Sequence, residues 1–262
     1  MLLKNHFKGK LKEVFLYITY KCNLKCLHCY MPDAKNIDMP IEAFEKMIEQ
    51  LVGFGASKIT LLGGEPTLHS LLPEFINTAK DLGITYIRMD TNGQFKQNLL
   101  KNPKLKLLND ICFSLDGIDS ATHGTIRTRK NYYSVINNIK SAISYGYTVR
   151  VTMTLNSLNL SQVEQMASKL ERLGVAALNL HLTSNSGKAR HNKWLLVDEE
   201  KWINFYKQTV PKLSKYDITV KIPMRFAKNN DLPTRDITCE AAKASRLSIT
   251  PDLKVYSCPL LL

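Results

Sequence analysis

Three cysteines lie close together near the start of this 262-residue chain, at Cys22, Cys26 and Cys29. Thiolates bind zinc and iron–sulfur clusters, and a single loop with these spacings can place three thiolates around one metal centre. Iron–sulfur clusters usually take four cysteines, so three ligands would leave one iron open for a chelating cofactor. A structural zinc site with His28 as fourth ligand is the alternative that these residues alone leave open.

The other three cysteines are Cys112, Cys239 and Cys258, and six cysteines could in principle form three disulfides. A chain of this length can build a core without disulfides, and no secretory signal precedes the clustered thiols. Thiols in such a chain stay reduced, so the cluster favours metal binding over disulfides. Cys112 lies in a β-rich apolar run, which predicts a core residue.

Short β-rich apolar runs alternate with helical stretches from Val14 to Asn179, the pattern of successive βα units around a parallel sheet. The predicted strands are Val14–Tyr20, Lys58–Leu62, Thr85–Asp90, Asp110–Leu115, Thr148–Thr154 and Ala177–Leu182. Apolar residues at three- and four-residue spacing predict helices at Ile41–Leu51, Leu72–Leu82, Tyr133–Ser144, Ser161–Leu173 and Asp198–Leu213. We therefore expect an α/β fold, a partial (β/α)6 TIM-like barrel over residues 1–224. The cysteine loop follows the first strand, where active sites of such barrels lie.

A second motif, Gly63-Gly64-Glu65-Pro66, ends the second predicted strand. Together with C-x3-C-x2-C after the first strand, it resembles the radical S-adenosylmethionine (radical SAM) superfamily. The resemblance implies that Cys22, Cys26 and Cys29 ligate a 4Fe-4S cluster whose fourth iron is chelated by S-adenosylmethionine. Reductive cleavage of this cofactor gives a 5′-deoxyadenosyl radical that abstracts a substrate hydrogen, with an electron donor such as flavodoxin or ferredoxin.

The same resemblance predicts cofactor contacts around the cluster. Gly63 and Gly64 lack side chains, so the strand end can approach the cofactor closely, and Glu65 offers a carboxylate for its amino group. His28 and Tyr30 flank the third cysteine, where the family places an aromatic residue beside the adenine.

Polar residues on two later strands extend the predicted cofactor site. Ser114 and Asp116 alternate at the end of the fourth strand, which resembles the ribose-binding strand end of the family. Simple turn chemistry at Asp116-Gly117 is the alternative. Arg150 and Thr152 share a face of the fifth strand and are predicted to meet the cofactor carboxylate or ribose.

The segment from 225 to 262 resembles the start of a SPASM or twitch domain, with a predicted hairpin around Pro251-Asp252 between Cys239 and Cys258. The resemblance implies an auxiliary 4Fe-4S cluster with Cys239 and Cys258 among its ligands. Leu253 departs from the family, which normally has glycine there. Only four residues follow Cys258, so the chain is a truncated form, the auxiliary site is degenerate, or exogenous ligands complete it.

The composition favours a folded protein, with 44% hydrophobic and 23% charged residues and a formal charge of +13. No run of eighteen apolar residues and no secretory signal is present, which predicts a cytoplasmic protein without a membrane partner. The lysines are scattered and no nucleic-acid-binding motif is present, so we expect no nucleic-acid partner. The positive charge is explained by a solvated surface or by attraction of an acidic substrate.

These observations favour a radical SAM enzyme that modifies a peptide or protein side chain by crosslinking, epimerisation or oxidation. The first alternative is a radical SAM dehydrogenase or epimerase acting on a small, sugar-like alcohol. The second alternative is a zinc-binding interaction module without catalysis.

Overall fold

A computed structural model of the chain describes residues 11–31, 36–128, 131–223 and 245–261. Its strands are β1 (Glu13–Tyr17), β2 (Lys58–Leu62), β3 (Tyr86–Thr91), β4 (Asp110–Ser114), β5 (Val149–Leu155), β6 (Ala177–Leu182), β7 (Thr219–Lys221), β8 (Arg246–Ile249) and β9 (Val255–Tyr256). Within the described residues these form one sheet in the order β7-β6-β5-β4-β3-β2-β1-β8-β9. All neighbours pair in parallel except β8 and β9.

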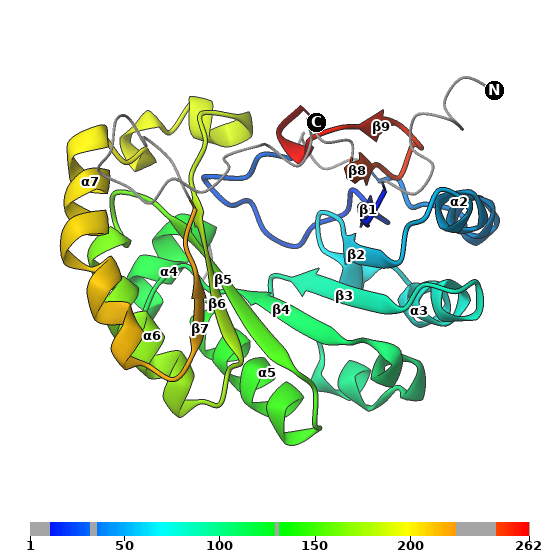
Figure 1. The fold of residues 1–262 in the computed structure, drawn as a ribbon, viewed down its shortest axis with the longest axis horizontal. Helices are drawn as coiled ribbons and strands as arrows, with labels where there is room; N and C mark the ends of the chain where they lie inside the picture. Colours follow the sequence, from blue (N-terminus) through cyan, green and yellow to red (C-terminus); the bar gives the residue numbers. More distant parts are fainter. Residues whose placement is uncertain (1–10, 32–35, 129–130, 224–244, 262) are drawn as a thin grey trace.

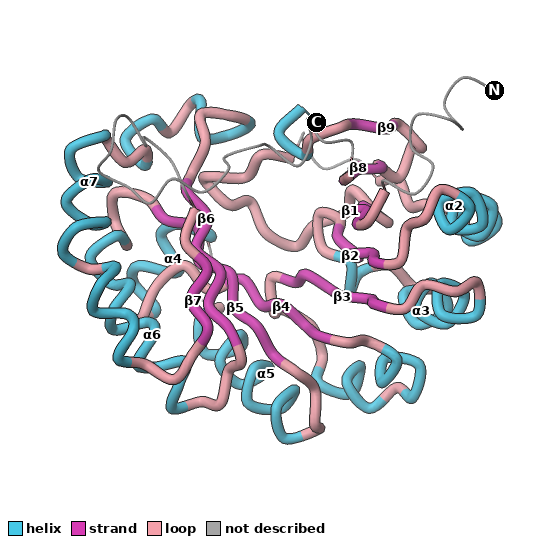
Figure 2. The backbone as a smooth tube through the Cα atoms, in the orientation of Figure 1, coloured by secondary structure: helices cyan, strands magenta, loops and turns pink. Residues whose placement is uncertain are grey.

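The helices lie on the outside of this curved sheet, which forms an open barrel (Figures 1 and 2). They are α2 (Ile41–Gly53), α3 (Leu72–Asp81), α4 (Ser120–Arg127), α5 (Tyr132–Ser144), α6 (Val163–Arg172) and α7 (Glu199–Gln208). The predicted α/β partial barrel is therefore confirmed. None of the described helices has the length and apolar character needed to cross a membrane.

The observed elements differ from the predicted ones in four main places. The three-residue strand β7 and the eight-residue helix α4 were not predicted, because both are too short for a periodic pattern. Between β3 and β4 the chain forms 3-10 helices at Gln97–Lys101 and Pro103–Leu107. Helix α7 ends at Gln208, before the predicted end at Leu213. The 3-10 helix that follows has Pro211 in its first turn, and proline cannot continue an α-helix.

Side-chain alternation along the strands separates an apolar outer face from a polar interior. On β5, Val149, Val151 and Met153 are at most 1% exposed and belong to the core between sheet and helices. Arg150 and Thr152 alternate with them and face into the barrel. The polar residues that could do chemistry are therefore directed to the barrel interior.

The C-terminal hairpin extends the barrel sheet. Strand β8 pairs in parallel with β1, and β9 returns antiparallel to β8 after the predicted turn at Pro251-Asp252. Tyr20, three residues after the end of β1, donates from its hydroxyl to Asp252 Oδ1 at 2.8 Å. The domain boundary predicted near Met224 lies outside the described residues and stays a prediction.

Leu253 occupies the left-handed region of this turn, with φ of 60°. A leucine there costs about 1–2 kcal/mol relative to ordinary backbone, whereas glycine adopts this conformation freely. Leu253 is 50% exposed, so its replacement removes little buried apolar surface. We predict that Leu253→Gly raises the free energy of unfolding by about 0.5–1 kcal/mol in urea denaturation.

The matched control is Val255→Gly, two residues away in β9 and 59% exposed. Glycine in a strand loses conformational entropy without relieving strain, so this variant should be less stable than the parent chain. Equal destabilisation by both glycines would contradict the strain at Leu253.

Candidate functional site

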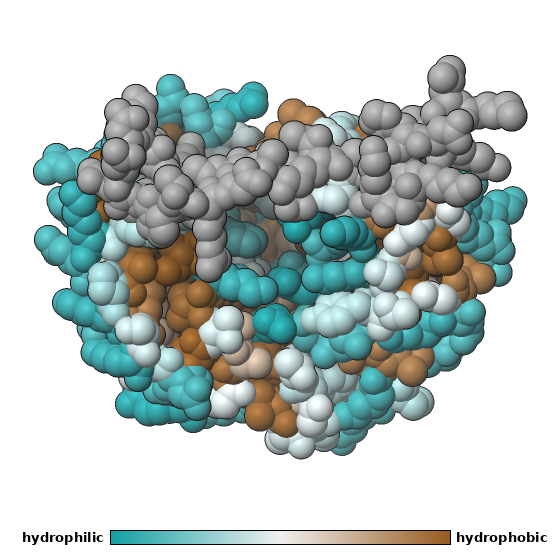
Figure 3. All heavy atoms as spheres, viewed as in Figure 1, coloured by the Kyte–Doolittle hydropathy of each residue, from teal (hydrophilic) through white to brown (hydrophobic). Residues whose placement is uncertain are grey.

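A cavity of about 520 Å³ opens inside the barrel, lined by residues at the carboxyl ends of the strands and in the loops that follow. The face shown in Figure 3 is hollowed near its centre, with hydrophilic side chains around the hollow. Ten of the predicted site residues line this cavity: Cys22, Cys26, His28, Cys29, Tyr30, Gly63, Gly64, Glu65, Ser114 and Thr152. Asp116, Arg150 and Cys258 do not line it, and Cys239 lies outside the described residues.

The three clustered cysteines all face the cavity from one loop. Cys26 is 8% exposed, and burial raises the pKa of its thiol to about 11. Burial also raises the pKa of Cys22 above its ordinary value. Within the described ranges no three His, Cys, Asp or Glu side chains converge tightly enough to hold one metal ion. Three thiols that face one cavity are a donor set that an iron–sulfur cubane can use, because each thiolate of a cubane binds a different iron.

The glycines of the second motif hold the start of the cysteine loop. Gly64 N donates to Thr19 O and Glu65 N donates to Lys21 O, both at 2.8 Å. A Cβ atom added to Gly64 would lie only 2.4 Å from Lys21 O, and one added to Gly63 would lie 2.7 Å from Thr19 O. The close approach that these glycines permit is therefore between the strand end and the backbone that leads to the first cysteine.

Glu65 is fully buried at the cavity wall and already has several hydrogen-bond donors. Its Oε1 accepts from the hydroxyls of Thr67 and Thr91, each at 2.7 Å, and its Oε2 accepts from Asn92 N at 2.7 Å. Burial raises the pKa of the carboxyl, while these hydrogen bonds lower it. The carboxylate is thus fixed between β2 and β3, and contact with a cofactor amino group stays a prediction.

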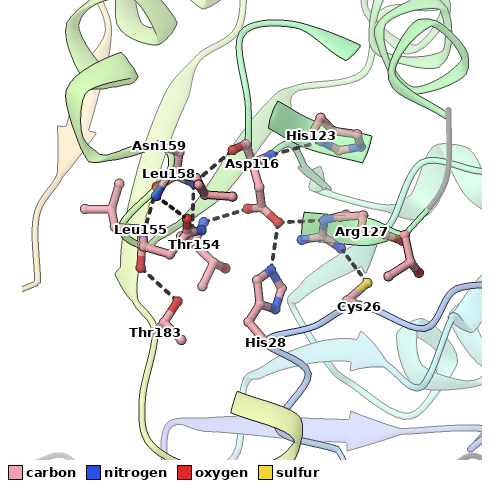
Figure 4. Close-up of polar contacts among 12 residues, drawn as sticks. Cys26, His28, Asp116, His123, Arg127, Thr154, Leu155, Leu158, Asn159 and Thr183 are labelled. Atoms are coloured by element: carbon pink, nitrogen blue, oxygen red, sulfur yellow. Dashed lines mark hydrogen bonds and ion pairs between the residues drawn. The ribbon is translucent and has the colours of Figure 1, made fainter. Parts of the chain in front are cut away.

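Asp116 was predicted to contact the cofactor, but its side chain does not line the cavity. It is fully buried and joins three segments of the chain (Figure 4). Its Oδ2 accepts from His28 Nε2 at 2.8 Å and from Arg127 Nε at 2.7 Å. Its Oδ1 accepts from Thr154 N at 2.7 Å. The charge of Arg127 holds the pKa of Asp116 well below its usual range despite burial. Asp116 therefore positions the cysteine loop, and its bond to His28 Nε2 also disfavours His28 as a zinc ligand.

Arg150 is also placed differently from the prediction. Its Nε lies 2.7 Å from Asp110 Oδ2, near the amino ends of β4 and β5, one layer away from the cavity. Thr152, two residues later, does line the cavity and lies 3.1 Å from the sulfur of Cys112. Cys112 is 1% exposed as expected of a core residue, yet it also contributes to the cavity wall.

A segment after β6, which the sequence did not single out, holds the other end of the cysteine loop. Lys188 N donates to Cys29 O at 2.8 Å, and Asn192 Nδ2 donates to Leu27 O at 3.2 Å. A Cβ atom on Gly187 would lie 2.3 Å from Cys29 O. The only sequence signal was the glycine in the turn-rich stretch Thr183-Ser-Asn-Ser-Gly187.

Comparison with known proteins agrees with this geometry. The profile of the Radical SAM superfamily matches residues 16–170, which include the cysteine loop, the glycine motif and Asp116. The chain belongs to the radical SAM superfamily. This family uses a 4Fe-4S cluster and S-adenosylmethionine, so these are the cofactors of the chain and it is an iron–sulfur enzyme. The alternative of a non-catalytic zinc module is thereby contradicted.

Two curated relatives differ in their described activities. The subtilosin biosynthesis protein AlbA of Bacillus subtilis (strain 168) is 30% identical over 198 residues, covering 71% of this chain and 42% of AlbA. A probable GTP 3′,8-cyclase of Methanococcus maripaludis (strain C7) is 29% identical over 177 residues, covering 66% of this chain and 59% of the cyclase. The chain thus spans only about half the length of these relatives.

Solved structures confirm the fold. Streptococcus suis SuiB bound to its precursor peptide SuiA superposes with a TM-score of 0.76 and 16% identity, covering 99% of this chain and 62% of SuiB. SuiB bound to S-adenosylmethionine gives a TM-score of 0.75. At this identity the likeness concerns the fold alone.

The docking of Gly187 against the cysteine loop gives a prediction. Gly187 has φ of 51°, so Gly187→Ala combines left-handed strain with a clash against Cys29 O. We expect the variant to lose at least about 1 kcal/mol more stability than the strain alone would remove. Reconstituted variant should also hold less iron per chain, because the loop no longer fits.

The control is Gly174→Ala, which shares the left-handed strain, with φ of 79°, but whose Cβ would meet nothing closer than 4.0 Å. It should retain the iron content of the parent chain. Equal loss of iron in both alanine variants would remove the docking role of Gly187.

His123 supplies a pH-dependent prediction. It is fully buried, its Nδ1 accepts from Asp116 N at 3.1 Å, and burial lowers its pKa from 6.5 to about 4. Between these values the unfolded chain binds a proton that the folded chain does not, so His123 makes stability fall as pH decreases from 6.5 to 4. In His123→Asn this component, up to about 3 kcal/mol, should be absent.

Urea unfolding of both chains at several pH values measures this component. The stability advantage of the parent chain over His123→Asn should be constant above about pH 7 and shrink toward pH 4. A difference that does not change with pH would show that His123 is not held neutral.

Proposed function

We propose that this chain cleaves S-adenosylmethionine and uses the 5′-deoxyadenosyl radical to abstract hydrogen from a peptide or protein side chain. The observation that carries the proposal is the opening of three thiols, Cys22, Cys26 and Cys29, onto the cavity that Glu65 also lines. The cluster and cofactor supply the radical chemistry, and the chain supplies position. The likeness to AlbA, described as a bacteriocin biosynthesis protein, and to SuiB bound to a precursor peptide supports a peptide substrate.

The part of the cavity wall formed by β4, β5 and β6 leaves polar groups available to ligands. Most polar side chains of the cavity already have partners, as Thr152 has Cys112 and Thr91 has Glu65. The side chains of Ser114, Thr154 and His181 line the cavity but have no hydrogen-bond partner among the described residues. Desolvation in the cavity lowers the pKa of the His181 imidazole below its ordinary value. We assign Ser114 to the cofactor, and Thr154 and His181 to the substrate.

A nucleotide is the second candidate substrate, because GTP 3′,8-cyclases are among the relatives. A triphosphate requires cations that are free to contact it. Among the described cavity residues the cations are Arg127 and Lys188, and both already have partners. This charge distribution favours a peptide over GTP, and it leaves a sugar-like alcohol as the remaining small-molecule alternative.

The remaining assignments belong to the same proposal. We expect flavodoxin or ferredoxin as electron donor, a cytoplasmic location, and no nucleic-acid or membrane partner. An auxiliary cluster held in part by Cys239 and Cys258 also stays a proposal, and Cys258 is half-buried beside the hairpin.

The test uses protein reconstituted anaerobically with iron and sulfide. With dithionite and S-adenosylmethionine, the parent chain should release 5′-deoxyadenosine, and the variant with Cys22, Cys26 and Cys29 all changed to Ala should release none. The matched control is Cys112→Ala, which removes a cavity thiol outside the proposed ligand set and should retain cofactor cleavage. Cleavage by the triple variant would refute the proposed ligands.

Substrate class is tested by adding a synthetic peptide library or GTP to the reconstituted parent chain. Peptides should stimulate 5′-deoxyadenosine formation and gain a mass change, whereas GTP should do neither. Stimulation by GTP alone, with conversion of the nucleotide, would overturn the peptide proposal and favour the second candidate.

A further inference from the structure

Arg127 places a buried positive charge against the cysteine loop. It is 7% exposed, lies at the end of α4, and donates from Nη1 to Cys26 Sγ at 3.9 Å (Figure 4). The neighbouring Ile126 O accepts from Leu27 N at 2.9 Å. The end of α4 thus contacts the loop through both its backbone and its guanidinium group.

The position of this charge is fixed by Asp116. Arg127 Nε donates to Asp116 Oδ2 at 2.7 Å, and Asp116 is itself held by Thr154 N and His28. A guanidinium group remains protonated in proteins, so the charge is permanent. No other cationic side chain in the described part of the chain is hydrogen-bonded to Cys22, Cys26 or Cys29.

We propose that Arg127 raises the reduction potential of the 4Fe-4S cluster by donating a charged hydrogen bond to its ligand Cys26. Reduction adds one electron to the cluster, taken from dithionite in the test below, and the added negative charge interacts favourably with a fixed cation. Hydrogen bonds to the sulfurs and net charge are two determinants of cluster potential. The inference rests on Cys26 as a ligand in the proposed function, and it is independent of the substrate.

The experiment is a redox titration of the reconstituted chain without S-adenosylmethionine. The electron paramagnetic resonance signal of the reduced cluster monitors the titration. In Arg127→Met the equilibrium constant for reduction should fall at least tenfold, a shift of about 59 mV to more negative potential. Iron content should match the parent chain. Arg127→Lys keeps the charge and should recover most of the shift.

The control for net charge is Lys140→Met on the exposed side of α5. It removes one positive charge far from the cavity and should leave the midpoint unchanged. An Arg127→Met protein with full iron and the parent midpoint would overturn the proposal, because loss of a cation that acts on the cluster must shift the potential of the cluster.

If Arg127→Met loses its cluster, Arg127→Lys and Arg127→Gln decide the question. Both retain a donor for Asp116, but only lysine retains the charge, so equal midpoints would overturn the proposal. A parent chain that gives no cluster signal after reconstitution would instead refute the ligand assignment on which the proposed function depends. Failure of the two proposals is therefore distinguishable.

Discussion

Burial of the Asp116 carboxylate is the interaction on which the geometry of the site depends. A carboxylate removed from water is costly unless it is paired and hydrogen-bonded. Here the donors come from the cysteine loop through His28, from α4 through Arg127, and from β5 through Thr154 N. Displacing any one of these segments would leave the buried carboxylate without one of its hydrogen-bond donors. The carboxylate therefore couples the positions of the three segments. The loop that carries the proposed cluster ligands is thereby fixed against the barrel wall.

Backbone contacts complete what this charge network begins. The cysteine loop is held at its start by Gly64 and near its end by Gly187, and both contacts are so close that a side chain at either glycine would overlap the loop. At Gly64 glycine is required because a Cβ atom would overlap the loop backbone. At Gly187 the left-handed backbone, with φ of 51°, is a second reason for glycine. Main-chain hydrogen bonds at Gly64 N and Lys188 N therefore hold the two ends of the loop, and they add to the side-chain network of Asp116.

The sequence predicted the six main strands, the cysteine loop and the glycine motif, because each is a local pattern. Alternation along β5 correctly predicted that Arg150 and Thr152 share a face. It did not predict that Arg150 pairs with Asp110, near the amino ends of β4 and β5 and away from the cavity. Asp116 was misplaced for a related reason: β4 ends at Ser114, so the two-residue alternation no longer holds at Asp116. Arg127 and Gly187 were missed because their contacts join residues that are far apart in the chain, to Cys26 and Cys29 respectively.

Thr154 links the two halves of the cavity. Its backbone N–H is bonded to Asp116, while its hydroxyl side chain lines the cavity beside His181, to which it is paired in register across β5 and β6. The carboxylate that orients Arg127 toward Cys26 therefore also fixes the backbone of Thr154, in the part of the wall where we place the substrate. Hydrogen abstraction is fastest when the target is held close to the radical in a fixed orientation. One buried carboxylate thus positions both the cysteine loop and the part of β5 where we place the substrate.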